Sequence, residues 1–357
     1  MLGDKIIMKA MVFHKIGDFR LEEVEKPVPT GNQILIKIGA CGICGSDIPR
    51  VYELGTRVAP VILGHEFSGV VEEVANKEDE YLLGKKVAVF PLIPCGECDM
   101  CHKGDYAKCS NYQYLGSRNN GGFAEYCLVP SKWHLVVPED QSINLEDLAI
   151  TEPATVAQHA MRMTNIHAGD SILITGAGPI GVLAARWARI MGANKIFISD
   201  IDDEKVSFVN NDGFIGINAL KNDVYEFINE NTDSRGVDVA LEGTGSSDGL
   251  NTVIKCVRAD GTIALMGNPH KDTILKLDNH SLILRKELNL RGVWNSYYNE
   301  IPINEWKYTV KMIEENKLVV HDLITNKVSL ENLKDLFDKI YEGEISIKKA
   351  LYFNSGE

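Results

Sequence analysis

The sequence predicts a two-domain α/β protein in which a β-rich domain precedes an open parallel sheet flanked by helices. Its 357 residues exceed the size of one ordinary domain. Residues 1 to about 155 consist of short alternating or β-branched runs between turns rich in Gly, Pro and Asn. From Ser171 to Val293, strand-like runs alternate with helical stretches, which is typical of βαβ units and a parallel sheet.

Each predicted element corresponds to a short run of residues. In the first domain the strand-like runs are 34–40, 60–74, 85–92 and 123–130. In the second domain they are SILIT (171–175), KIFISD (195–200), VDVALEG (237–243), TIALMG (262–267) and LNLRGVW (288–294). Two amphipathic segments (303–316 and 330–343) and a strand-like run (347–353) form a tail that is too short to bury its own core. We therefore expect this tail to return to the first domain, which gives domain limits of 1–157, 158–295 and 296–357.

The composition argues against several classes of function. Lys and Arg number 37 against 50 Asp and Glu, a net charge of −13, so nucleic acid and anionic lipid would be repelled. The N-terminal residues lack the apolar region and cleavage site of a secretory signal. The longest apolar run, 172–185, contains three glycines and a proline and is shorter than a bilayer requires. We expect a cytoplasmic protein that acts on a small molecule, with no nucleic-acid or membrane partner.

Four of the eight cysteines, Cys95, Cys98, Cys101 and Cys109, are spaced C-x2-C-x2-C-x7-C. In a reducing compartment such a cluster of thiols indicates a metal site rather than disulfides. Four thiolates can surround a tetrahedral Zn²⁺ and leave no open position, so this zinc would be structural. An iron–sulfur cluster is the alternative, but its ferredoxin spacing has x3 and a following proline where this chain has x7 and Ser110.

The first strand of the second domain leads into the glycine motif Gly176-Ala177-Gly178-Pro179-Ile180-Gly181. Glycine triplets also arise by chance in turns, but here the motif stands between a predicted strand and a predicted helix, as the dinucleotide fingerprint requires. Gly176 permits the tight turn, Gly178 lets a pyrophosphate approach the backbone, and Gly181 lets the helix pack against the strand. The helix N-terminus then offers N–H groups to the phosphates. We therefore predict a Rossmann domain, a doubly wound parallel sheet that binds a dinucleotide.

The next predicted strand ends at Asp200, 24 residues after Gly176. A carboxylate at this position accepts hydrogen bonds from the adenosine ribose hydroxyls and repels a 2′-phosphate. The following residues, 201–204, add negative charge and no arginine. These features favour NAD over NADP. The alternative interpretation, an acid that only caps the next helix, suits Asp202 better than Asp200.

Three further motifs lie in the first domain: Cys44-Gly45-Ser46-Asp47, Gly64-His65-Glu66 and Thr151-Glu152-Pro153. Taken separately, each has an ordinary interpretation. Cys41 and Cys44 could form a redox pair, His65 could be a core histidine, and Glu152 could be an acid at a helix N-terminus. Cys and His are, however, good zinc ligands, and a carboxylate with a water would complete a site that keeps an exchangeable position.

In this order, and ahead of a dinucleotide-binding fold, these motifs resemble the zinc-dependent medium-chain dehydrogenase/reductase family over essentially the whole chain. The glutamates of the GHE and EP motifs resemble those of its polyol branch, the sorbitol dehydrogenases. The resemblance implies an α/β Rossmann domain with strand order 3-2-1-4-5-6, a β-rich GroES-like catalytic domain, and an active site in the cleft between them. It also implies NAD and two zinc ions, one catalytic and one structural. We further expect a homodimer or homotetramer.

The resemblance also assigns roles to individual residues. It implies that Cys44 and His65 bind the catalytic zinc, and that Glu66 and Glu152 coordinate it directly, through water or in exchange. Ser46 matches the hydroxyl that relays the substrate proton. Pro49 replaces the histidine that continues this relay in alcohol dehydrogenases, so cofactor ribose, water and Glu66 stay open as carriers. The implied cofactor-lining positions are Lys205, Thr244 within 242–245, Gly267 within 266–268, and Asn295 within 293–295.

Two stretches, 116–126 and 284–288 continuing to 294–295, resemble more narrowly the galactitol-1-phosphate 5-dehydrogenases, as does the segment that ends at Arg50. This resemblance implies oxidation of galactitol 1-phosphate to tagatose 6-phosphate. Arg50 and Arg118 then become candidate phosphate partners, because guanidinium groups match phosphate oxygens; a surface salt bridge is the alternative. Other candidate substrates are an unphosphorylated polyol such as sorbitol, 2,3-butanediol and L-threonine. A non-catalytic nucleotide-binding relative is a different class, and the intact Cys44, His65 and Glu152 argue against it.

Overall fold

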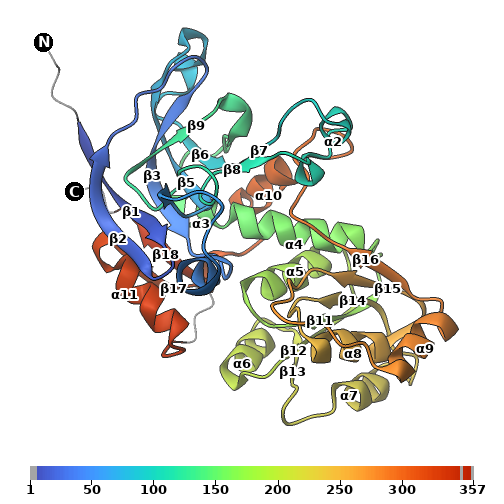
Figure 1. Cartoon of the computed structure of the whole chain (residues 1–357). Coiled ribbons are helices and arrows are strands. Elements are labelled where there is room, and N and C mark those ends of the chain that lie inside the picture. The colour runs from blue at the N-terminus through green and yellow to red at the C-terminus, as the bar shows by residue number, and fades with distance from the viewer. Residues whose placement is uncertain (1–5, 346–348, 355–357) are drawn as a thin grey trace, which may run out of the picture. The chain divides into compact units, whose positions relative to one another are not determined.

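The computed structural model describes residues 6–345 and 349–354, and the chain folds into two compact units (Figure 1). Unit 1 comprises residues 1–152 and 297–357, and unit 2 comprises residues 153–296; the sequence analysis set the limits at 157 and 295. Residues 347 and 348 of the predicted terminal strand lie outside the described residues. Among the described helices, none is both long enough and apolar enough to cross a membrane.

Unit 1 is β-rich, as predicted. Its smaller sheet has the order β2-β1-β4, with β1 at Ile7–Lys15, β2 at Asp18–Glu25 and β4 at Val61–Ile62. The larger sheet has the order β10-β6-β5-β3-β18-β17, and β9 also pairs with β3. Its strands are β3 (Ile34–Gly42), β5 (Glu66–Val74), β6 (Lys86–Val89), β9 (Tyr126–Val129), β10 (Leu135–Val136), β17 (Ile324–Val328) and β18 (Lys349–Phe353). Strands β7 (Leu92–Ile93) and β8 (Gln113–Tyr114) form a separate pair.

The helices of unit 1 include two from the C-terminal tail. They are α1 (Asp47–Pro49), which continues into a π-helical turn at Arg50–Leu54, α2 (Asp99–His102), α3 (Leu145–Ala149), α10 (Glu305–Glu314) and α11 (Leu330–Tyr341). Leu330, Leu333, Leu336 and Phe337 form the buried face of α11. The Phe337 ring lies 4.9 Å from Phe19 and 5.8 Å from Phe123. In Figure 1 the red tail accordingly lies against the blue N-terminal strands of its own unit, where β18 pairs with β3.

Unit 2 contains one parallel sheet of order β13-β12-β11-β14-β15-β16, which confirms the predicted order 3-2-1-4-5-6. Its strands are β11 (Ser171–Thr175), β12 (Lys195–Asp200), β13 (Ile215–Asn218), β14 (Val237–Glu242), β15 (Val257–Leu265) and β16 (Asn289–Gly292). Its helices are α5 (Pro179–Ile190), α6 (Asp203–Asn211), α7 (Val224–Asn231), α8 (Ser247–Cys256) and α9 (Leu277–Arg285), while α4 (Thr151–Met163) begins in unit 1. The core includes the buried side chains of Leu173, Phe197 and Ile263. The sequence analysis named no strand at β13.

Candidate active site

Three of the predicted zinc ligands meet in the larger sheet of unit 1. Cys44 follows β3, His65 immediately precedes β5, and Glu66 begins β5. Pairing of β3 with β5 places Gly42 opposite Glu66. One potential ligand atom of each residue, Cys44, His65 and Glu66, lies within 4.8 Å of the other two. His65 and Glu66 are buried and Cys44 is half-buried, so two motifs that are separate in the sequence form one cluster that could hold a metal ion.

Gly64 determines the backbone path into this cluster. Its φ is +90°, a backbone conformation that residues other than glycine rarely adopt. A Cβ there would also lie only 2.7 Å from Cys41 Sγ and 2.8 Å from Phe123 Cγ. The glycine of the GHE motif is therefore needed to bring His65 and Glu66 beside Cys44.

Asp47 supports the cluster, although the sequence analysis gave it no role. Its fully buried carboxylate accepts hydrogen bonds from the Cys44 N–H at 3.1 Å and from Arg50 Nη1 at 2.7 Å. Asp47 Oδ1 also lies 3.6 Å from His65 Nδ1. This separation exceeds hydrogen-bond distance, so Asp47 holds the cluster through the Cys44 N–H and not through the imidazole. A signal was available in the sequence, because Asp47 is the third residue after Cys44 in the same motif.

Glu152, the fourth predicted ligand, lies in the first turn of α4 beside this cluster. The Tyr114 hydroxyl donates a hydrogen bond to Glu152 Oε1 at 3.2 Å, and the Tyr114 ring packs edge-on against His65 at 5.7 Å. Burial raises the pKa of Glu152 to about 7; His65 opposes this rise and Glu66 adds to it. Glu152 thus contacts the surroundings of the cluster but is outside the group of three residues within 4.8 Å.

Lys349, which the sequence analysis missed, lies buried beside Glu66. Its Nζ forms an ion pair with Glu66 Oε2 and donates a hydrogen bond to the Ile43 carbonyl at 3.0 Å. Burial alone would lower the pKa of Lys349, but Glu66 and Cys44 outweigh burial and raise it. The only sequence signal was weak: alternation along β18 places Lys349 on the same side as the buried Leu351.

The donor set of the cluster suits zinc. A thiol, an imidazole and carboxylates are ligands of catalytic zinc sites. Burial, followed by Glu66 and Asp47, raises the pKa of the Cys44 thiol to about 12, and a metal ion would bind it as the thiolate. His65 Nδ1 is buried without a hydrogen-bond partner. Ser46, the predicted proton relay, donates to Cys44 Sγ at 3.2 Å and accepts a hydrogen bond from Arg50 Nη1 at 3.2 Å.

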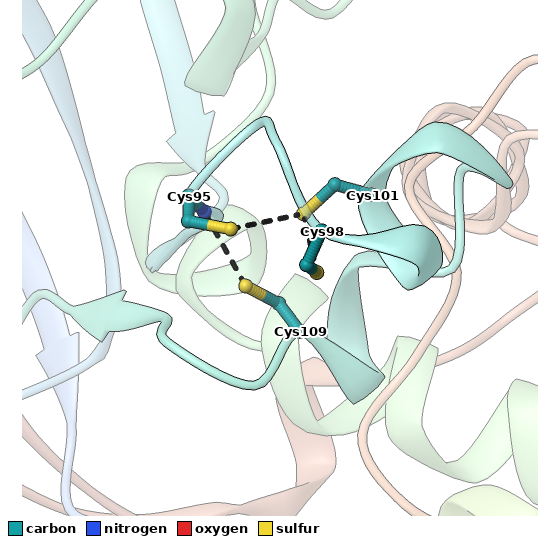
Figure 2. Close-up of side chains that lie close together, drawn as sticks. All are labelled: Cys95, Cys98, Cys101 and Cys109. Carbon is teal, nitrogen blue, oxygen red and sulfur yellow. Dashed lines mark hydrogen bonds between the residues drawn. The ribbon is translucent and has the colours of Figure 1, made fainter.

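The four cysteines of the loop 95–109 form a second cluster, in which the sulfur atoms point toward one another (Figure 2). All four sulfur atoms lie within 4.8 Å of one another. All eight cysteines of the chain are free thiols. Hydrogen bonds from the backbone of Cys101 and Ser110 lower the pKa of Cys98 to about 6, whereas burial raises the pKa of Cys101 to about 12. Four converging sulfur atoms match the tetrahedral ligand set of structural zinc.

The predicted nucleotide-binding turn joins β11 to α5 in unit 2. Gly176 has a φ of +92°, and Gly178 is the N-cap of α5, with Pro179 as its first residue. A Cβ on Gly181 would lie 1.9 Å from Gly176 O, whereas a Cβ on Gly178 would meet no atom within 4 Å. Gly181 is therefore required for α5 to pack against the turn, and Gly178 leaves space for a ligand at the helix N-terminus.

Asp200 ends β12 beside this turn. Its Oδ2 accepts a hydrogen bond from the Ala177 N–H at 2.7 Å, and its Oδ1 accepts one from the Asp202 N–H at 3.0 Å. Asp202 caps α6, because its Oδ1 accepts from the N–H groups of Glu204 and Lys205. The expectation that Asp202, rather than Asp200, caps the helix is confirmed.

The other predicted cofactor-lining residues follow neighbouring strands of the same sheet. A Cβ on Gly176 would lie 3.4 Å from Thr244 Cγ2, and one on Gly267 would lie 2.0 Å from Gly245 N, so the turns after β11, β14 and β15 adjoin one another. Lys205 lies in the first turn of α6, and Asn295 follows β16. The carboxyl ends of parallel strands are where such sheets bind ligands.

Glu242, which the sequence analysis placed in the lining without a role, holds one of these turns. Its buried carboxylate accepts hydrogen bonds from the N–H groups of Thr244 at 2.9 Å and Gly245 at 3.1 Å. The turn after β14 is therefore fixed by a side chain from the end of the strand.

The two arginines predicted as phosphate partners are both engaged. Arg50 forms a salt bridge with Asp47, a buried rather than a surface acid. Arg118 Nη1 donates to the Tyr112 carbonyl, and its guanidinium stacks 4.0 Å from the centre of the Tyr112 ring. A phosphate would have to share each guanidinium with these contacts.

Comparison with known proteins decides the family. Residues 30–139 match the model of the alcohol dehydrogenase GroES-like domain, and residues 179–315 match that of the zinc-binding dehydrogenase. Galactitol 1-phosphate 5-dehydrogenase of Escherichia coli (strain K12) is 34% identical over 327 residues, covering 91% of this chain and 94% of that protein. The chain belongs to the zinc-dependent medium-chain dehydrogenase family.

Similar proteins differ in the substrate that they are named for, and one is bound to NADP. Sorbitol dehydrogenase of Bacillus subtilis (strain 168) is 30% identical over 352 residues, covering 97% of each chain. The crystal structure of Escherichia coli galactitol-1-phosphate dehydrogenase has a TM-score of 0.91 at 31% identity, covering 97% of this chain and 100% of that one. A zinc-binding dehydrogenase from Sinorhizobium meliloti 1021 bound to NADP has a TM-score of 0.90 at 26% identity, covering 98% and 100%. This medium-chain dehydrogenase is thus an oxidoreductase of the alcohol and polyol class that uses zinc and a nicotinamide cofactor.

Proposed function

We propose that this medium-chain dehydrogenase oxidises galactitol 1-phosphate to tagatose 6-phosphate with NAD. The observation that carries the proposal is the 34% identity to the Escherichia coli galactitol 1-phosphate 5-dehydrogenase over 91% of the chain. The resemblance of residues 116–126 and 284–288 to that group of enzymes supports the same substrate. The homodimer or homotetramer and the cytoplasmic location stay predictions.

In this proposal Cys44 and His65 would hold the catalytic zinc, with Glu66 and Glu152 as the carboxylates beside it. Zinc supplies a Lewis acid that favours loss of the alcohol proton, and NAD supplies the hydride acceptor. Ser46 would relay the substrate proton, its oxygen accepting that proton as its own hydroxyl proton leaves, because Ser46 lies beside Cys44 and is exposed to solvent. Since Pro49 has no polar side chain to continue the relay, the proton would pass from Ser46 to water.

The four cysteines Cys95, Cys98, Cys101 and Cys109 would hold a second, structural zinc. Asp200 supports NAD as the cofactor, because a carboxylate at the end of β12 would repel the 2′-phosphate of NADP. Its oxygens accept two backbone hydrogen bonds, which hold the carboxylate beside the glycine turn.

An unphosphorylated sugar alcohol such as sorbitol is the second candidate substrate. The observation that favours it is the engagement of Arg50 by Asp47 and of Arg118 by Tyr112. A phosphate bound by either guanidinium would have to share it with these contacts, and at Arg50 it would also lie near the negative charge of Asp47. The sorbitol dehydrogenase relative, at 30% identity over 97% of the chain, supports the same alternative.

Initial rates of NAD⁺ reduction on galactitol 1-phosphate, galactitol, sorbitol, 2,3-butanediol and L-threonine test the proposal. We expect the highest kcat/KM on galactitol 1-phosphate. Arg118→Ala should raise KM for this substrate about ten- to hundredfold, because a charge-assisted hydrogen bond contributes about 1.5–3 kcal/mol. Turnover of sorbitol should change little.

A higher kcat/KM on sorbitol than on galactitol 1-phosphate would replace the first candidate with the second. If Arg118→Ala lowered kcat/KM equally on galactitol 1-phosphate and on sorbitol, Arg118 would serve only to pack against Tyr112.

A further inference from the structure

A buried carboxylate without a cationic partner lies at the end of β14. Glu242 is 4% exposed, and none of the described Lys, Arg and His residues forms an ion pair with it. Four other buried carboxylates each have such a partner: Asp47 has Arg50, Glu66 has Lys349, Asp79 has Lys132, and Asp238 has Arg258. A buried charge that lacks a counter-charge is costly. A cationic ligand beside Glu242 would supply the missing counter-charge.

Hydrogen bonds hold this carboxylate in place but do not neutralise it. Glu242 Oε1 accepts from the Thr244 N–H at 2.9 Å and from the Thr244 hydroxyl at 2.5 Å. The Gly245 N–H lies 3.1 Å from both carboxylate oxygens. These donors are neutral, and both oxygens act as acceptors, as in an ionised carboxylate. A Cβ on Gly249 would lie 2.5 Å from Oε1, so the first turn of α8 is adjacent, but a helix N-terminus contributes only roughly half an elementary charge.

The charge lies in the half of the sheet that a dinucleotide leaves to its nicotinamide. β14 is next to β11, where the strand order of the sheet reverses (Figure 1). Dinucleotides bind across this point, with one mononucleotide over each half of the sheet. The turn at Gly176 and the carboxylate of Asp200 belong to the half that would hold the pyrophosphate and the adenosine. The nicotinamide is therefore expected over the half that begins with β14, where Glu242 is the last residue of the strand.

We propose that the Glu242 carboxylate makes the site selective for the oxidised form of the cofactor. The nicotinamide ring carries one positive charge in NAD⁺ and none in NADH, so the carboxylate attracts only the oxidised ring. Such an attraction in a partly buried site changes a binding constant by about tenfold. The enzyme would then bind NAD⁺ in the presence of NADH and hold NADH less tightly after the oxidation. The inference deepens the proposed function at its cofactor and does not depend on the substrate.

A charge and a structural support predict different results. If Glu242 only holds the turn after β14, its loss should weaken NAD⁺ and NADH alike, because the two differ only in the nicotinamide ring. If its charge acts, loss of the charge should weaken NAD⁺ alone. Glu242→Gln keeps an oxygen for the donors of Thr244 and Gly245 and removes the charge. Glu242→Asp keeps the charge and withdraws the oxygens from these donors.

Titration calorimetry of the full chain with NAD⁺ and, separately, with NADH measures both affinities without substrate. Glu242→Gln should raise Kd for NAD⁺ about tenfold and leave Kd for NADH near its wild-type value. Glu242→Asp should keep the wild-type ratio of the two Kd values even where both cofactors bind more weakly. Asp238→Asn is the matched control, because it removes a buried carboxylate near the other end of β14. This control should leave the ratio unchanged.

The ratio of the two Kd values decides the outcome. An unchanged ratio in Glu242→Gln, whether both cofactors weaken equally or neither does, would overturn the proposal. A change in Glu242→Asp as large as that in Glu242→Gln would also overturn it, because the charge would not be the cause. Glu242→Ala, which also lacks the charge, decides if Glu242→Gln does not fold.

Failure of the proposed cofactor would be recognised separately. If wild type bound NADP⁺ more tightly than NAD⁺, the proposed use of NAD would be wrong. The nicotinamide rings of NADP⁺ and NADPH differ by the same charge, so the ratio of their Kd values would then test Glu242 in the same variants.

Discussion

Replacement of Gly181 by alanine should disrupt the nucleotide-binding turn. The added Cβ would lie 1.9 Å from Gly176 O, whereas real Cβ contacts essentially never fall below 3.0 Å, so α5 and the turn must separate by about 1.1 Å. Overpacking of this kind costs about 1–3 kcal/mol of folding free energy. The displaced helix N-terminus would no longer direct its N–H groups at the pyrophosphate. If the free energy of NAD binding is weakened by the same 1–3 kcal/mol, NAD affinity drops by about five- to 150-fold.

Gly178→Ala is the matched control, because its Cβ would meet no atom within 4 Å and its φ is −71°. This variant should keep the wild-type free energy of unfolding within about 0.5 kcal/mol. It should still weaken NAD binding, since the methyl group occupies the space at the helix N-terminus. Urea unfolding and titration calorimetry measure the two quantities. Wild-type stability and NAD affinity in Gly181→Ala would refute the packing argument, and wild-type affinity in Gly178→Ala would refute the position assigned to the pyrophosphate.

Three further predictions concern the other sites. Cys98→Ser should remove about one zinc per chain and lower Tm, because three thiolates hold the metal less well than four; metal analysis and calorimetry check this, and an unchanged zinc content would contradict it. Asp200→Ala should narrow the difference in kcat/KM between NAD and NADP by removing charge repulsion; equal use of NADPH and NADH by wild type would contradict it. Burial alone would raise the pKa of Asp238, but hydrogen bonds from Ser171 and Arg258 hold it at about 2, below the ordinary value of 3.8. Asp238 therefore stabilises the fold above about pH 4 and loses this effect as the pH falls toward 2. Asp238→Asn should be less stable than wild type at pH 7 and approach it near pH 2 in urea unfolding, whereas a difference independent of pH would argue against this assignment.

The features that could be predicted from the sequence are those determined within one turn or loop. The glycine motif and the capping role of Asp202 depend on residues a few positions apart, so spacing alone indicates their geometry. Strand β13 escaped notice because its four residues, with Gly216 among them, carry too little periodicity. Its place in the sheet comes from pairing with β12. The contacts of Arg118 depend on the path of its loop, which spacing does not describe.

The candidate metal cluster combines residues that short motifs predict with one residue that only the fold brings to the site. Cys44 and the pair His65 and Glu66 are recognisable as short motifs. Lys349, however, lies in the last described strand, and only sheet pairing brings it to Glu66. No local pattern around either residue contains that information.

The central position of β3 explains why the C-terminal strand belongs to the active site as well as to the core. β3 pairs with β5 on one side and with β18 on the other, and it leads directly to Cys44. The three strands thus present Cys44, Glu66 and Lys349 close to Gly42, the one residue of β3 that leaves room for the ion pair. Side chains held on paired strands keep their positions more firmly than side chains on loops. Loss of β18 would remove a neighbour of β3 and also the counter-charge of a buried carboxylate. We therefore attribute to this strand both the closure of the sheet and the control of the charge that faces the proposed zinc site.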